Sequence, residues 1–154
     1  RKGAYVANMS LKDVIDVLEI RASLEGLAAS LAAQRMNSDD IKKLEKIAKE
    51  YEKSIKDSDL ETSLIKDVEF HECIFKATNN KKLHHLINSL WEQVYRFRVT
   101  YISDYGSSLS IINEHKLILD AIKKGDTELA KKYATEHIEK AEQFMIEKAN
   151  NKEL

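Results

Sequence analysis

The sequence predicts an all-α protein, an antiparallel bundle of six helices joined by short turns. Three observations favour this fold class. The 154 residues contain no proline and only four glycines, whereas a strand-rich fold needs more of these turn-forming residues. Apolar residues recur with a helical period in six successive segments. Short clusters of Asn, Asp, Ser and Gly separate the segments, as is typical of helix ends. The length fits a single domain with a sizeable core.

Each helix is expected from its own start and stop signals. Ser10 and Asp13 resemble a capping box at the start of a helix that runs to about Arg35. Ser38 can cap a second helix, IKKLEKIAKEYEKSI, which ends at the DSD of 57–59. The remaining helices are expected at about 60–77, from the Asn79-Asn80 pair to about 102, from the end of a loop, DYGSS (104–108), to 124, and from the Gly125-Asp126 break to about 149. Residues 1–9 (RKGAYVANM) are expected to form a short extended segment.

Composition and charge exclude several functional classes. The formal net charge is −1, from 25 basic and 26 acidic residues, and a nucleic-acid-binding module usually shows a basic excess. No apolar run approaches the roughly 20 residues of a membrane-spanning helix, and no segment resembles a signal peptide. Cys73 is the only cysteine, so a reducing cytoplasm is the expected location. The chain begins at Arg1 rather than Met, which suggests part of a longer protein.

Four ionisable residues lie at the centres of predicted apolar helix faces. Asp67 and His71, four residues apart, share one face of the third helix. His115 is central on the apolar face of the fifth helix, and His137 on that of the sixth. These faces comprise Leu60, Leu64, Phe70, Ile74 and Thr78; Ile111, Ile112, Ile118, Leu119 and Ile122; and Ala130, Tyr133, Ala134, Ala141 and Phe144. Because residue 126 is midway between His115 and His137, both imidazoles are expected at the same height in the hairpin.

A carboxylate and three imidazoles in an apolar interior need a partner, because unsatisfied buried polar groups are unfavourable. A divalent cation satisfies them directly, and zinc is the first candidate among zinc, nickel, manganese and iron. The alternative is structural. A single histidine on an apolar face is more often a hydrogen-bonded core residue, and Asp67 with His71 could form a helix-face ion pair. Similar placements on three separate helices favour the metal.

Two arginines also fall on predicted inward faces. Arg98 lies within the apolar face of the fourth helix, and Arg21 lies at the edge of the core side of the first helix, one turn before Glu25. One interpretation is a buried Arg21–Glu25 pair that tethers helices. The other is that Arg21 and Arg98 present guanidinium groups to a carboxylate ligand. A metal beside inward-facing arginines would suit a small organic acid.

Four segments of the chain resemble one known family. They are EIRASLEGLAASLAA (19–33), DVEFHECIFKATNNKKL (67–83), EHKLILDAIKKGDTELA (114–130) and the EHI around His137. In this order they resemble the FadR C-terminal (FCD) domain, the effector-binding half of one branch of GntR-type bacterial transcription regulators. The opening RKGAYVA is similar to the last wing strand of the winged helix-turn-helix that precedes this domain. The resemblance therefore predicts a wing remnant at 1–9 and an FCD domain at 10–154.

The resemblance implies a six- or seven-helix antiparallel bundle that holds a metal through one Asp and three His. Those positions match Asp67, His71, His115 and His137. It also implies a small carboxylate effector, with Arg21 matching a family arginine that faces the ligand and Arg98 carried over as a second. Family members that bind acyl-CoA lack the metal residues, so that type is not expected here.

The expected function is sensing by a homodimeric regulator that contacts DNA only through an upstream domain, with the first helix as the relay. Two alternatives stay open. A metal-dependent hydrolase would need a general base. Glu25 is the one obvious inward carboxylate left for that role, and the arginines can occupy it, so we expect no enzyme. A structural metal in a dimerisation domain would need a saturated coordination shell.

Overall fold

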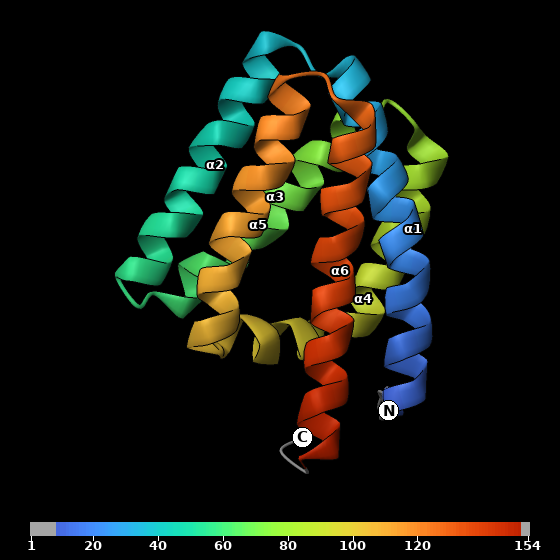
Figure 1. Ribbon diagram of the computed structural model, residues 1–154, viewed down its shortest axis with the longest axis vertical. Coiled ribbons are helices and arrows are strands. Elements are labelled where there is room, and N and C mark those ends of the chain that lie inside the picture. The colour runs from blue at the N-terminus through green and yellow to red at the C-terminus, as the bar shows by residue number, and fades with distance from the viewer. Residues whose placement is uncertain (1–8, 152–154) are drawn as a thin grey trace, which may run out of the picture.

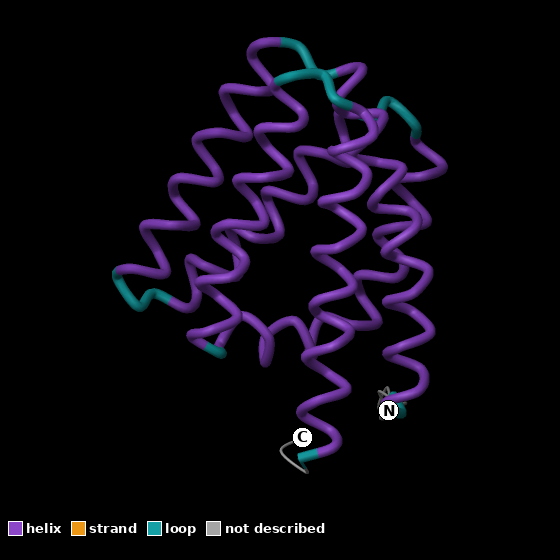
Figure 2. Tube along the Cα trace, viewed as in Figure 1, coloured by secondary structure: helices purple, strands orange, loops and turns teal. Residues whose placement is uncertain are grey.

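The computed structural model describes residues 9–151 and shows, within that range, six helices and no strand (Figure 2). The helices are α1 (Leu11–Arg35), α2 (Ser38–Lys56), α3 (Leu60–Ala77), α4 (Lys81–Ser103), α5 (Tyr105–Lys123) and α6 (Thr127–Asn150). The predicted all-α fold class is confirmed, with six helices rather than seven. The predicted extended segment at 1–9 lies outside the described residues, apart from Met9.

Side-chain caps set the helix boundaries. Ser10 forms the predicted capping box with Asp13, and Asp126 caps α6 directly after Gly125, whose φ of 65° suits glycine. Two boundary predictions were wrong. Asn37, not Ser38, caps α2, because its side chain accepts a hydrogen bond from the Asp40 amide. The other wrong prediction is the start of the fifth helix.

The predicted loop at 104–108 is nearly all helix, since α5 begins at Tyr105. Asp104 ends α4 and also caps α5 by accepting a hydrogen bond from the Ser107 amide at 2.9 Å. One capping residue thus replaces the loop, and Gly106 with the serines after it forms the first turn of α5. This short connection turns the chain sharply between two helices that contribute to the same interior.

The helices pack around an interior shared by α1, α3, α4, α5 and α6 (Figure 1). α5 and α6 form a hairpin, α1 packs along α6, and α2 covers α3 and α5 at the outer edge of the bundle. α3 and α4 lie behind these helices in Figure 1, and the described chain starts and ends at the same end of the bundle. No described helix is long and apolar enough to cross a membrane.

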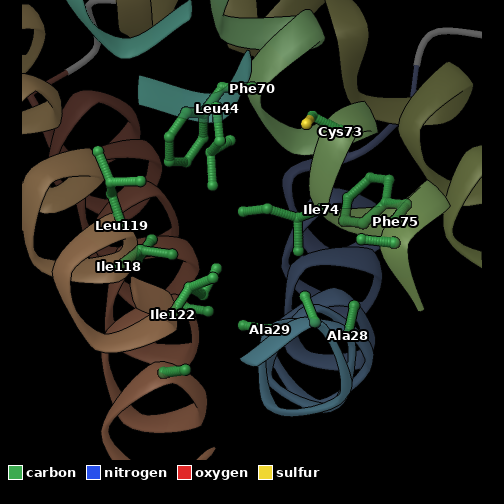
Figure 3. Packing of buried hydrophobic residues seen from close by; sticks show 14 of the residues in the cluster. Ala28, Ala29, Leu44, Phe70, Cys73, Ile74, Phe75, Ile118, Leu119 and Ile122 are labelled. Carbon is green, nitrogen blue, oxygen red and sulfur yellow. The ribbon is translucent and has the colours of Figure 1, made fainter. Parts of the chain in front are cut away.

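Aliphatic and aromatic side chains from all six described helices fill one half of the bundle, part of which Figure 3 shows. Phe70 and Ile74 of α3 are buried there, as predicted, opposite Ile118 and Ile122 of α5. Leu60 was expected on the same buried face but is 42% exposed, since it is the first residue of α3. This packed half fixes the spacing of α3, α5 and α6, which carry the candidate site.

Candidate metal centre

Three histidines from three helices meet inside the bundle. His71 of α3, His115 of α5 and His137 of α6 each offer a ring nitrogen, and these nitrogens all lie within 4.8 Å of one another. All three side chains are buried. The Nε2 atoms of His71 and His137 are 3.2 Å apart. The α5–α6 hairpin places His115 and His137 at matching heights, with ring centroids 5.4 Å apart.

Asp67 belongs to the same cluster, one turn before His71 on α3. Its Oδ1 atom lies 3.4 Å from Nε2 of His115 and 3.8 Å from Nε2 of His71. The structure therefore brings all four residues of the predicted set together. Phe70 stacks on His115 with centroids 3.9 Å apart and an interplanar angle of 12°, which fixes the plane of that ring.

The cluster contains buried polar atoms without partners. Oδ1 of Asp67 and both ring nitrogens of His115 make no hydrogen bond with the described residues. Such atoms are normally satisfied in a folded protein. A cation would satisfy Oδ1 and one imidazole nitrogen at once. The 3.2 Å between Nε2 of His71 and Nε2 of His137 is close to the roughly 3.3 Å expected of two imidazoles on one tetrahedral zinc ion. The residues present thus fit a divalent metal.

The ionisation of these groups also suits metal binding, which needs neutral imidazole and ionised carboxylate. Burial lowers the pKa of His115 to about 3 and lowers the pKa of His71. Burial alone would raise the pKa of Asp67, but the charge of Arg98 holds that pKa well below its usual range. At neutral pH, His71 and His115 are therefore uncharged and Asp67 is negative.

Two buried glutamates orient two of the histidines. Oε2 of Glu25 lies 3.0 Å from Nδ1 of His71, and Oε2 of Glu114 lies 2.5 Å from Nδ1 of His137. Each carboxylate accepts a hydrogen bond from Nδ1–H, so each Nε2 keeps its lone pair for the centre of the cluster. Carboxylates in this position commonly fix the tautomer and orientation of metal-binding histidines.

Both glutamates are ionised in spite of burial. Burial would raise the pKa of Glu114, but the hydrogen bond from His137, with further contributions from Ser110 and Lys140, lowers that pKa to about 2. Burial would likewise raise the pKa of Glu25, but the charge of Arg21 and the hydrogen bond from His71 bring it below the usual range. Glu25 had been considered as a general base, but the guanidinium of Arg21 engages its other oxygen.

The two predicted arginines lie beside the cluster, both buried. Arg21, expected at the edge of a face, is fully inside, where it forms the ion pair with Glu25 that one interpretation proposed. Arg98 pairs with Oδ2 of Asp67 and places Nη2 3.0 Å from Nε2 of His71. Both guanidinium groups lie over Trp91, with their central carbons 4.5 and 4.4 Å from its centroid.

Glu114 was missed by sequence reasoning. It precedes His115, and adjacent helical residues point about 100° apart, so placing His115 inward placed Glu114 at a boundary. α6 covers that boundary, and Glu114 faces His137 across the hairpin. The usable signal was the hairpin geometry itself, which brings 114 as well as 115 to the height of 137. The contact of Trp91 with two cations was not foreseen either.

Comparisons with known proteins identify the family of this chain. The FCD domain model matches residues 16–140. The chain is 29% identical over 139 residues to the HTH-type transcriptional regulator YdhC of Bacillus subtilis, covering 89% of this chain and 62% of that protein. It is 28% identical over 134 residues to the gluconate operon transcriptional repressor of the same organism, covering 84% and 55%. The chain therefore spans about 60% of the length of such relatives.

Solved structures show the same fold. E. coli McbR/YncC superposes with a TM-score of 0.81 at 19% identity, over 89% of this chain and 69% of that one. Streptococcus agalactiae GntR superposes with a TM-score of 0.78 at 22% identity, over 92% and 64%. The curated relatives are transcription regulators rather than enzymes. The chain belongs to the FCD domain family of GntR-type transcription regulators.

Proposed function

We propose that this domain senses a small organic acid with the help of a divalent metal. Asp67, His71, His115 and His137 would hold the metal, with zinc as the first candidate, and Arg21 and Arg98 would bind the acid. One observation carries the proposal. Atoms of Asp67 and His115 that could bind a metal lie without hydrogen-bond partners beside two buried guanidinium groups. A bound divalent ion would supply a Lewis-acid contact for an oxygen of the acid.

The balance of charge supports an anionic effector. Without a metal, Arg98 is paired with Asp67 and Arg21 with Glu25, and Glu114 lies 3.4 Å from Nζ of the half-exposed Lys140. A divalent cation adds two positive charges to this buried group. Net positive charge is unfavourable in an apolar interior, and a carboxylate that reaches the metal or the arginines reduces it. An anion should therefore bind the metal-loaded form better than the metal-free form.

The relay to DNA is assigned to α1. This helix carries Arg21 and Glu25 into the centre and begins directly after the segment 1–9, proposed as the end of a DNA-binding wing. YdhC is described as an HTH-type regulator and is longer than this chain, which supports a DNA-binding domain outside the sequence. A homodimer in the cytoplasm, with 10–154 as the sensing domain, completes the proposal. The effector would act by changing the position of α1.

Two measurements on the domain test the proposal. Elemental analysis after purification should find about one divalent metal per chain, and a variant with His115→Ala and His137→Ala should lose it. The matched control is His85→Ala, which removes an exposed histidine of α4. Equal metal content in the double variant and the control would rule out the site.

The role of the acid is tested by thermal denaturation with acetate as the simplest carboxylate. Acetate should raise the melting temperature of the metal-loaded protein more than that of the chelator-treated protein. If no carboxylate changes the melting temperature of the metal-loaded protein, the ion is purely structural. An enzyme is not favoured, because Glu25 and Glu114 are both held by buried partners and neither is left to act as a base.

A further inference from the structure

A small cavity lies next to the candidate centre, between α1, α4 and α6, which contact one another; α4 lies behind the other two helices in Figure 1. Its free volume is about 20 Å³, enough for about one water molecule. Arg21 and Arg98 line it on the side of the metal cluster. The remainder of the wall is apolar apart from Tyr101, and consists of Leu18, Val94, Phe97, Ala141 and Met145.

Each of the two lining arginines keeps one nitrogen of its guanidinium outside the hydrogen bonds to the cluster. Hydrogen bonds to Glu25 engage Nε and Nη2 of Arg21, and those to Asp67 and His71 engage the same two nitrogens of Arg98. Among the described residues no hydrogen bond engages Nη1 of either side chain. A carboxylate held by these groups would therefore have its remaining atoms in the apolar part of the cavity.

From this arrangement we infer that the effector is a monocarboxylate with an apolar tail, such as a short aliphatic or aromatic acid, and not a polyhydroxylated acid. The inference rests on the proposed function. Hydroxyl groups of a sugar acid would lose water against Val94, Ala141 and Met145 without gaining hydrogen bonds, at a cost of roughly tenfold or more in affinity for each group. One relative is named as a gluconate operon repressor, so gluconate is the polyhydroxylated acid to compare with an acid that has an apolar tail.

The cavity must widen to admit such a tail, and its wall contains the side chains that can move. Phe97 is the one lining residue that is not buried, so it marks the mouth. Met145 is unbranched and adapts its shape readily. Displacement of these two side chains would extend the cavity away from the arginines, toward solvent. The tail would then be covered by apolar atoms along its length.

The test measures the affinity of the zinc-loaded domain for acetate, propionate, butyrate and pentanoate by calorimetry, with gluconate and benzoate alongside. Each added methylene should strengthen binding about fourfold until the cavity is filled, and gluconate should bind at least tenfold more weakly than pentanoate. Affinity that does not depend on tail length, or gluconate binding as tightly as pentanoate, overturns the inference but leaves the proposed function intact. Absence of binding by every acid, acetate included, overturns both.

Two variants locate the tail in this cavity. Val94→Thr adds a hydroxyl to the wall at nearly constant volume and should weaken pentanoate binding about fivefold or more, with acetate binding unchanged. Val68→Thr, on the exposed surface of α3, is the matched control. Ala141→Val narrows the cavity, so the affinity should stop rising at a shorter acid than in the parent protein. If pentanoate binds to both cavity variants as it does to the control, the tail lies elsewhere and the inference fails.

Discussion

Replacement of Glu114 by glutamine tests whether the buried glutamates tune the candidate metal site. The carboxylate of Glu114 accepts a hydrogen bond from Nδ1 of His137 at 2.5 Å and is 4% exposed. Glutamine has the same size, and its amide oxygen can still accept that hydrogen bond. The substitution therefore removes a charge while it keeps the packing. His137 becomes a weaker donor to the metal, and its tautomer is less firmly fixed.

The expected loss of metal affinity is about 10- to 100-fold, the range found when carboxylates behind metal-binding histidines are replaced. This corresponds to roughly 1.4–2.7 kcal/mol. Glu25→Gln should act in the same range through His71, whose Nδ1 lies 3.0 Å from Glu25. Its effect includes an added loss of stability, because Arg21 would be left without its charged partner. Glu114→Gln is therefore the cleaner substitution.

Zinc affinity is measured by competition with a chromophoric chelator, and circular dichroism checks that each variant is folded. Glu139→Gln serves as the matched control, because Glu139 is an exposed glutamate two residues from His137 on α6. The control should bind zinc like the parent protein. If a folded Glu114→Gln variant also binds zinc within twofold of the parent, Glu114 does not tune the site and the reasoning is refuted.

Three further outcomes are expected. Removal of metal with a chelator should lower the melting temperature by about 5–11 °C relative to protein in the presence of free metal at 100 times its dissociation constant. Metal at that concentration stabilises the folded state by about 2.7 kcal/mol. A melting temperature that does not change in calorimetry would contradict metal binding to the folded state. Arg98→Met should destabilise the metal-free protein by roughly 3–5 kcal/mol, since Asp67 loses its buried partner, and zinc should restore part of this in urea titrations; equal losses with and without zinc would argue against an ion at Asp67. Burial raises the pKa of the Cys73 thiol, so the folded protein holds less reactive thiolate at pH 8 and should react with a disulfide reagent at least about tenfold more slowly than the unfolded protein; similar rates would show that Cys73 is accessible.

Helical periodicity was sufficient to predict that the four candidate metal residues face the interior. Asp67, His71, His115 and His137 each interrupt an apolar face, and a face is a property of one helix that can be read from spacing alone. The matching heights of His115 and His137 in the α5–α6 hairpin followed from their equal distance along the chain to the turn. These predictions need neither the order of the helices in space nor the conformation of any side chain.

The partners of these residues could not be predicted in the same way. Whether Arg98 reaches Asp67 depends on how α4 crosses α3, and the spacing along either helix says nothing about that crossing. Arg21 was expected at an edge, but the other helices cover the whole residue and its guanidinium pairs with Glu25 in the interior. The cavity beside it is likewise formed by three helices together and has no sequence signal.

The position of Arg98 predicts that the metal and the acid, if both bind as proposed, affect each other's binding. Its guanidinium is bound to Asp67 and His71 on one side and lines the apolar cavity on the other. A cation that approaches Asp67 weakens the hold of that carboxylate on Arg98, because the two positive groups share one negative partner, and an anion in the cavity then offers Arg98 a replacement.

Binding of each ligand should therefore strengthen binding of the other, and thermodynamic linkage requires the two effects to be equal. We expect pentanoate to raise zinc affinity by the same factor by which zinc raises pentanoate affinity, about 5- to 150-fold for coupling of ordinary size. In Arg98→Met this factor should fall toward the value set by the charge of the metal alone. Coupling of unchanged size in a folded Arg98→Met variant would show that Arg98 does not link the two sites, and that the acid contacts the metal without it.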